Sequence, residues 1–186
     1  MNEHESILNY GASSGSSVMS APDVNQALLA ELKKNGADYV VSVPCKLLGG
    51  FISTLEKDDD ITYRAVNREE EGLGICTGAY LAGRTPVMVM QNTGVGTLIT
   101  SLCSLANYYR LPFLMVISHR GSPGEPIGAQ VPMGTAVETL LQTINVPTYM
   151  YSDPSDVKKI GQLVPFTSVA EGPVAAILDY DFWGAR

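Results

Sequence analysis

The sequence predicts an α/β fold, a three-layer sandwich in which helices cover both faces of a mainly parallel sheet of about six strands. Short apolar runs rich in Val, Ile and Tyr alternate along the chain with longer segments of helical character. This alternation is typical of βα units and a parallel sheet. The chain has 186 residues, 45% of them hydrophobic, which is enough for one domain with its own core.

The first half of the chain contains two helix signals and two strands. A helix is expected from Ser20 and Pro22 to a stop at Asn35-Gly36, because these residue types favour helix ends. The residues before it include GASSGSS, so 1–19 are expected to form a flexible arm and 20–186 the domain. The next expected elements are a strand at 39–44, a weak helix at 47–57, a turn at 58–60 and a strand at 61–66.

The second half continues the alternation. The expected elements are a helix at 69–82, a strand at 86–91, a helix at 95–109, a strand at 111–118, a helix at 135–146, a strand at 146–151, a helix at 153–172 and a strand at 173–180. Pro165 is expected to interrupt the last helix, because proline lacks the amide hydrogen that a helix interior uses.

Composition excludes several classes of protein. The net charge is −7 and no Lys/Arg cluster is present, which argues against nucleic-acid binding. No apolar run approaches the ~20 residues of a membrane span, and the first residues lack the basic and apolar regions of a signal peptide. Three separated cysteines, Cys45, Cys76 and Cys103, predict free thiols in a reducing cytoplasm rather than a metal site or disulfides.

Four loops follow expected strands, and ligands bind at the carboxyl ends of parallel strands. These loops are Pro44 to Lys46, Asn67 to Glu71, Gln91 to Gly96 and Ser118 to Gln130. Only 17% of the residues are charged, below the usual ~25%, and one explanation is a large surface covered by a partner.

The second loop places three glutamates, Glu69 to Glu71, before a helix of small residues, GLGICTGAYLAG. Acidic residues in a first turn complement the helix dipole by ~0.3–1 kcal/mol each, which accounts for the charges. It does not account for Gly72, Gly74 and Gly78, since each glycine inside a helix costs up to ~1 kcal/mol against alanine. The glycines predict the close approach of another helix or of a second subunit.

The third loop, QNTGVGTL, has neither the GxGxxG pattern of a dinucleotide site nor a Walker A lysine. It is equally consistent with a tight turn and with a ligand approaching the backbone. The fourth loop begins with His119 and Arg120. Arginine suits a carboxylate, phosphate or sulfonate, but Arg120 paired with a nearby acid and His119 closing the loop are equally plausible.

Taken together, VNREEEGLGICTGAY, MQNTGVG and SHRGSPGEP resemble the pyrimidine-binding (PYR) domain of thiamine-diphosphate-dependent enzymes, from about Pro22 to Tyr180. The second and third elements resemble the sulfopyruvate and phosphonopyruvate decarboxylases. The run REEEGLGICTGAYLAG, preceded by SVPCKLL, is most similar to α subunits of the sulfopyruvate enzymes. The resemblance implies a PYR-type fold and decarboxylation of 3-sulfopyruvate to sulfoacetaldehyde and CO2, in coenzyme M biosynthesis or other sulfonate metabolism.

The resemblance also implies roles for individual residues. The family's catalytic glutamate, which contacts N1′ of the cofactor's aminopyrimidine, corresponds to Glu70 when counted back from Tyr80, with Glu71 as the alternative register. Cofactor contacts are expected from Glu70, Gln91, Asn92, Thr93 and Gly94. Substrate contacts are expected from Lys46, Asn92, His119, Arg120 and Gln130.

The Gly-Asp-Gly start of a diphosphate-binding domain is missing from the sequence. The resemblance therefore implies a separate β subunit that holds Mg²⁺ and the diphosphate of thiamine diphosphate, in a hetero-oligomer whose active site this chain only half supplies. No metal ligands are expected here. Two alternatives remain open: a subunit acting on phosphonopyruvate or another 2-oxo acid, and a non-catalytic α/β binding module.

Overall fold

The computed structural model describes residues 21–185, so the predicted arm at 1–19 lies outside the described residues. Its six strands form one sheet in the order β2-β1-β3-β4-β6-β5, and every neighbouring pair is parallel. The strands are β1 Tyr39–Ser42, β2 Thr62–Ala65, β3 Pro86–Gln91, β4 Phe113–Ser118, β5 Thr148–Tyr151 and β6 Pro173–Leu178. The predicted fold class is confirmed.

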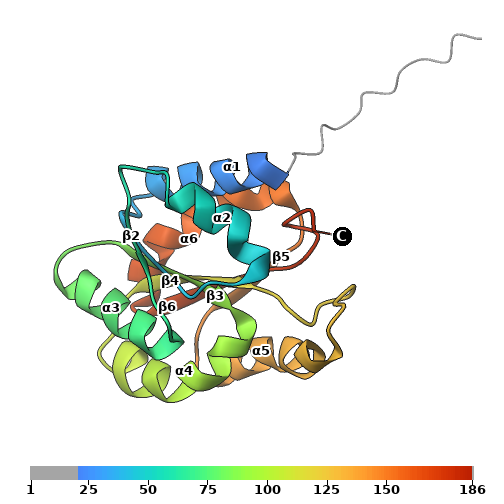
Figure 1. Ribbon diagram of the computed structural model, residues 1–186. Coiled ribbons are helices and arrows are strands. Elements are labelled where there is room, and N and C mark those ends of the chain that lie inside the picture. The colour runs from blue at the N-terminus through green and yellow to red at the C-terminus, as the bar shows by residue number, and fades with distance from the viewer. Residues whose placement is uncertain (1–20, 186) are drawn as a thin grey trace, which may run out of the picture.

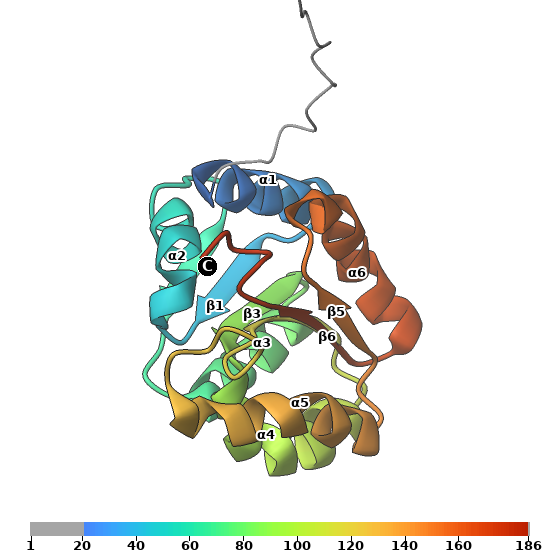
Figure 2. The ribbon, with the colours of Figure 1, turned by 90° about the vertical axis from the view of Figure 1, so that its right-hand side faces the viewer.

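Helices cover both faces of the sheet (Figures 1 and 2). The helices are α1 Ala21–Lys34, α2 Gly49–Leu55, α3 Glu69–Leu81, α4 Val95–Ser101, α5 Val131–Thr143 and α6 Val157–Ala170. Helices α1, α2 and α6 pack on one face, and α3, α4 and α5 on the other, so each face has its own apolar core. The central strands β3, β4 and β6 are buried almost throughout, as expected for parallel strands covered on both sides.

Three helix predictions need correction. Helix α5 begins at Val131, four residues before the predicted start, because Pro132 lies in its first turn, where the missing amide hydrogen costs nothing. Helix α6 runs through Pro165, because the burial of Val164 and Thr167 against the core outweighs the one helical hydrogen bond that proline cannot donate. Helix α4 continues as a π-helical segment, η3, at Leu102–Asn107.

Candidate active site

The four predicted loops lie at the carboxyl ends of adjacent strands. Strands β1, β3 and β4 are neighbours in the centre of the sheet, and Gln91 at the end of β3 pairs in register with Ser118 at the end of β4. The chain leaves β1 toward β2 on one side and β3 toward β4 on the other, which is the switch point where α/β proteins bind ligands.

Side chains connect the ends of these three strands. The thiol of Cys45 lies 3.2 Å from Gln91 Oε1 and 3.7 Å from Ser118 Oγ. The amide nitrogen of Gln91 donates to the hydroxyl of Thr93 and, at 3.3 Å, to Gln130 Oε1. Gln91, Thr93 and Gln130 were predicted site residues, and the structure brings them together in one polar cluster with Cys45.

Asn92 holds the backbone of the fourth loop. Its side chain is fully buried. Its Nδ2 donates to the carbonyl of Arg120 at 2.7 Å, and its Oδ1 accepts from the amide of Arg120 at 3.0 Å. Asn92 thus fixes the position of the backbone where β4 ends and the fourth loop begins. Both polar atoms of its side-chain amide are used in hydrogen bonds to Arg120.

The guanidinium of Arg120 is bound by Glu125 of the same loop. Nε and Nη2 donate to the two carboxylate oxygens at 2.8 and 2.7 Å, and the two side chains are only 10% and 1% exposed. Glu125 also accepts from the hydroxyl of Tyr180 at 3.0 Å. The hydrogen bond from Arg120 lowers the pKa of Glu125 to about 2, against the opposing effect of burial, so the pair is ionised near neutral pH.

His119 points to the α5 side of the sheet. Its Nε2 lies 2.9 Å from the carbonyl of Gly134, and since a carbonyl only accepts, Nε2 must carry the proton. Nδ1 is buried and has no hydrogen-bond partner among the described residues. His119 therefore fastens the fourth loop to α5, and the structure does not place it with the Lys46 side chain on the other face.

Two glycines allow this fastening. Gly121 has φ of +84°, and a Cβ there would collide with the backbone of Gln130 and Val131. A Cβ on Gly134 would lie 2.6 Å from the carbonyl oxygen of Arg120. The close approach of loop and helix keeps Gln130 within reach of Gln91.

The three glutamates at the start of α3 have different surroundings. The side chain of Glu69 lies against Gly94, on the inner side of the helix. Glu71 Oε2 accepts from the amide of Asn67 at 3.2 Å, in the manner of a capping box. Glu70 lies 3.7 Å from Arg68, and its side chain is 34% exposed.

The three glycines of α3 also differ in their surroundings. Gly72 is buried, and a Cβ there would lie 3.0 Å from Met88 Cε, so it packs tightly within the chain. Gly74 and Gly78 are exposed, and a Cβ on either would meet nothing within 4 Å. Because Glu70, Gly74 and Gly78 are spaced four residues apart, they share one face of the helix, and that face is open.

A cavity of about 620 Å³ lies beside the site, on the α1–α2 side of the sheet. Lys46 and Arg120 line it, together with aromatic and apolar side chains and the end of the described chain. The other lining residues are Asn25, Leu47, Gly50, Pro126, Ile127, Tyr180, Trp183, Gly184 and Ala185.

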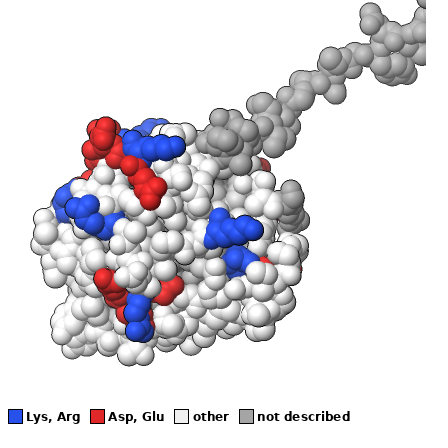
Figure 3. Space-filling view, viewed as in Figure 1, with Lys and Arg blue, Asp and Glu red and all other residues white. Residues whose placement is uncertain are grey.

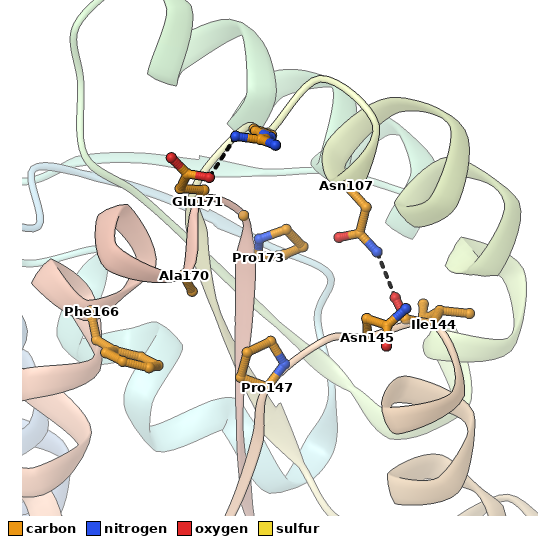
Figure 4. Close-up of a pocket in the computed structure, with 10 residues that line it drawn as sticks. Asn107, Ile144, Asn145, Pro147, Phe166, Ala170, Glu171 and Pro173 are labelled. Atoms are coloured by element: carbon orange, nitrogen blue, oxygen red, sulfur yellow. Dashed lines mark hydrogen bonds and ion pairs between the residues drawn. The ribbon is translucent and has the colours of Figure 1, made fainter.

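A second hollow lies at the opposite, amino edge of the sheet (Figure 4). Arg110, Asn145 and Glu171, which line it, are the non-glycine residues with positive φ among the described residues. Each lies within three residues of the end of a helical segment, where a left-handed residue is common. None of the predicted site residues lies there.

Among residues 21–185, no group of three or more His, Cys, Asp or Glu side chains is arranged to hold a metal ion. In that same range, no helix is long and apolar enough to cross a membrane.

Sequence reasoning missed Glu125 and Tyr180 as parts of the site. Glu125 lies in the run SHRGSPGEP, and an acid five residues after Arg120 is a possible partner for its guanidinium. Tyr180 follows the last strand, β6, at the same carboxyl edge as the other loops. Including the loop after this strand as a fifth ligand-binding loop would have identified Tyr180 from the sequence.

Comparison with known proteins places these features in a family. Residues 22–138 match the model described as thiamine pyrophosphate enzyme, N-terminal TPP binding domain. The chain is 40% identical over 162 residues to the sulfopyruvate decarboxylase subunit alpha of Methanococcus maripaludis, covering 87% of this chain and 97% of that protein. It is 38% identical to the subunit of the same name from Methanothermobacter thermautotrophicus, covering 87% and 98%.

Among solved structures, a 2-oxoglutarate:ferredoxin oxidoreductase from Magnetococcus marinus superposes with a TM-score of 0.67 at 17% identity, over 88% of this chain and 29% of that one. That likeness concerns the fold. The chain therefore spans less than a third of that enzyme but nearly the full length of the sulfopyruvate decarboxylase alpha subunits.

Proposed function

The chain belongs to the family of thiamine pyrophosphate enzyme N-terminal TPP binding domains, and we propose that it is the α subunit of a decarboxylase converting 3-sulfopyruvate to sulfoacetaldehyde and CO2. The similarity to sulfopyruvate decarboxylase alpha subunits along 97% of their length supports this choice of reaction. The observation within the chain that carries the proposal is the surroundings of Glu70. Its carboxylate lies at the carboxyl edge of the sheet, at the end of an open helix face.

The surroundings of the three glutamates favour Glu70 as the catalytic residue over the alternative, Glu71. The carboxylate of Glu71 is engaged with the amide of Asn67, and Glu69 is turned inward against Gly94. Glu70 is partly exposed, so its carboxylate remains available to a ligand bound between this chain and a partner.

The residues at this edge fit the aminopyrimidine of thiamine diphosphate. The ring needs a carboxylate to share a proton at N1′ and polar groups for its amino substituent. In this proposal Glu70 supplies the carboxylate. Gln91, Thr93 and the Gly94 backbone, at the end of the neighbouring strand β3, supply polar and closely approachable groups, and the glutamate that lies against Gly94 is Glu69. The bound cofactor supplies the carbon nucleophile and the electron sink for decarboxylation.

The partner in this proposal is a β subunit that carries the diphosphate-binding domain and Mg²⁺. Helix α4 and η3 contain no charged residue, and in Figure 3 the bottom rim of the surface, below a small group of blue and red side chains, is uncharged. With Gly74 and Gly78 open on α3, these helices offer a surface of small and neutral residues. Such a surface permits close packing of a second chain without burying unpaired charge.

The cellular setting is also part of the proposal. Cys45, Cys76 and Cys103 are all unpaired, and free thiols suit the reducing cytoplasm. In that setting the reaction would serve coenzyme M biosynthesis.

Reconstitution tests the proposal. Decarboxylation of 3-sulfopyruvate is measured with this chain alone, a candidate β chain alone and the mixture, each with thiamine diphosphate and Mg²⁺. We expect activity only in the mixture, at least 100-fold lower with Glu70→Gln, since acid–base catalysis contributes ~10²–10⁴-fold. Phosphonopyruvate and pyruvate, run in parallel, test the alternative substrates. If no mixture shows activity or binds the cofactor, the proposal is wrong and the chain is better explained as a non-catalytic binding module.

Matched variants separate the three glutamates. Glu69→Gln and Glu71→Gln should retain most of the activity, because the Glu71 carboxylate caps the helix at the Asn67 amide and that of Glu69 packs against Gly94. If Glu71→Gln removes activity while Glu70→Gln does not, the catalytic role belongs to Glu71.

The docking surface has its own test. Gly78→Leu places a large side chain where the partner must approach, so co-purification with the β chain should fall at least tenfold, while the circular dichroism of the single chain stays the same. Val169→Ala, an exposed site on α6, is the control. Equal association of both variants would place the partner elsewhere.

A further inference from the structure

The cavity beside Lys46 has an unusual balance of charge. Two cations, Lys46 and Arg120, line it. Arg120 is neutralised by Glu125 at 2.7 Å, and that carboxylate is 1% exposed. Lys46 is exposed and forms no ion pair with any of the described residues. None of the described residues that line the cavity is acidic, so within residues 21–185 the charge of Lys46 has no partner in the cavity wall.

The walls of the cavity are apolar. Tyr180 and Trp183 are 8% and 5% exposed, and both turn their polar atoms into the protein. The Tyr180 hydroxyl donates to Glu125, and the Trp183 indole nitrogen donates to the carbonyl of Leu178 at 3.3 Å. Their rings face the cavity with Leu47, Pro126 and Ile127. Its volume of about 620 Å³ lies within the ~300–1,000 Å³ usual for small-molecule sites.

Two residues of the cavity wall adjoin residues of the candidate active site. Lys46 directly follows Cys45, which contacts Gln91. Arg120 is held by Asn92 through both of its backbone groups. Lys46 and Arg120 are thus tied to the residues of the candidate active site through Cys45 and Asn92.

We propose that this cavity binds the sulfonate group of the substrate, that Lys46 is the residue that binds it, and that Arg120 only positions the loop. This inference rests on the proposed function, whose reaction requires a site for a second anion. The charge also predicts specificity. A sulfonate carries one negative charge and matches one free lysine. A phosphonate can lose a second proton, and its dianion leaves one negative charge unpaired.

The test uses Trp183, the single tryptophan of the chain, as a reporter of the cavity. The full chain is titrated with 3-sulfopropanoate, a non-reacting analogue, at constant ionic strength, while tryptophan fluorescence is recorded. We expect a saturable change, weakened about 10- to 100-fold in Lys46→Met, as for the loss of a hydrogen bond to a charged group. Lys57→Met, an exposed lysine beyond the far end of α2, should bind as the unaltered chain does.

Further arms identify the anion. 3-Phosphonopropanoate should bind more weakly than 3-sulfopropanoate, and butanoate, which lacks the second anion, should not saturate. Ile127→Arg adds a second cation at an exposed position of the wall and should shift the preference toward the phosphonate at least tenfold. In the mixture with the β chain, Lys46→Met should lower the ratio of kcat/KM for 3-sulfopyruvate to that for pyruvate by the same factor.

Equal binding of 3-sulfopropanoate by the Lys46→Met and Lys57→Met chains, or no saturable change in the unaltered chain, would overturn the inference. Decarboxylation by the mixture that is insensitive to Lys46→Met would do the same and leave the proposed function intact. Saturable, Lys46-dependent binding without any decarboxylation would instead sink the proposed function and preserve the anion site.

Discussion

Two arginine–glutamate pairs lie at opposite edges of the same sheet. At the carboxyl edge, Arg120 and Glu125 are 2.7 Å apart and their side chains are 10% and 1% exposed. At the amino edge, Arg110 and Glu171 are also 2.7 Å apart, but 70% and 60% exposed (Figure 4). The distance is the same, yet the first pair is surrounded by protein and the second by water. Burial, together with the second hydrogen bond that Arg120 donates to its carboxylate, therefore decides how the contributions of the two pairs differ.

Removing one charge from each pair should give the largest contrast. Glu125→Gln leaves the Arg120 charge buried and unpaired and should destabilise the fold by about 3–5 kcal/mol. Glu171→Gln, the matched control at the exposed pair, should cost less than about 1 kcal/mol. Urea denaturation of both variants measures the difference, and similar losses would mean that burial does not distinguish the pairs.

Glycines near the two edges extend the comparison with a smaller effect. Gly134→Ala introduces a Cβ 2.6 Å from the Arg120 carbonyl oxygen and should cost about 1–3 kcal/mol, as overpacking usually does. Gly172→Ala at the amino edge meets nothing closer than 3.8 Å and should be near neutral. Thermal melting of both variants provides the measurement, and tolerance of Gly134→Ala would show that the fourth loop is free to move.

Acid should affect the buried pair specifically. Arg120 lowers the pKa of Glu125 from its ordinary value of 4.5 to about 2. A carboxylate with a lowered pKa stabilises the folded state above about pH 4.5 and loses that contribution as the pH falls toward 2. Between these values the melting temperature of the unaltered chain should fall more steeply than that of Glu125→Gln. Parallel curves for the two proteins would contradict this assignment.

Salt should produce the smallest difference. At 1 M salt the screening length is about 3 Å, so a double-mutant cycle on Arg110 and Glu171 should give a coupling close to zero. The same cycle on Arg120 and Glu125 should retain most of its coupling, because little solvent reaches that pair. A buried pair as salt-sensitive as the exposed one would mean that water enters the fourth loop.

The same contrast shows what sequence reasoning resolves. The motif SHRGSPGEP contains both Arg120 and Glu125, and the sequence left Arg120 as either a ligand for an anion or a partner of an acid. The folded loop selects the second possibility, because Gly121 and Gly134 allow the chain to turn Glu125 back onto the guanidinium. The run of three glutamates was likewise ambiguous until the helix gave each one a different neighbour.

The sequence by itself determined the alternation of strands and helices, the parallel sheet, and the four loops at its carboxyl edge. Those features depend on the spacing of apolar residues and on turn residues, which are local properties of the chain. Only the tertiary structure decided that Lys46 is the cation left free in the cavity and that Gly74 and Gly78, unlike Gly72, face outward. Whether a charge is paired and whether a glycine is buried depend on contacts between segments that are distant in the sequence. The order of residues along the chain does not specify those contacts.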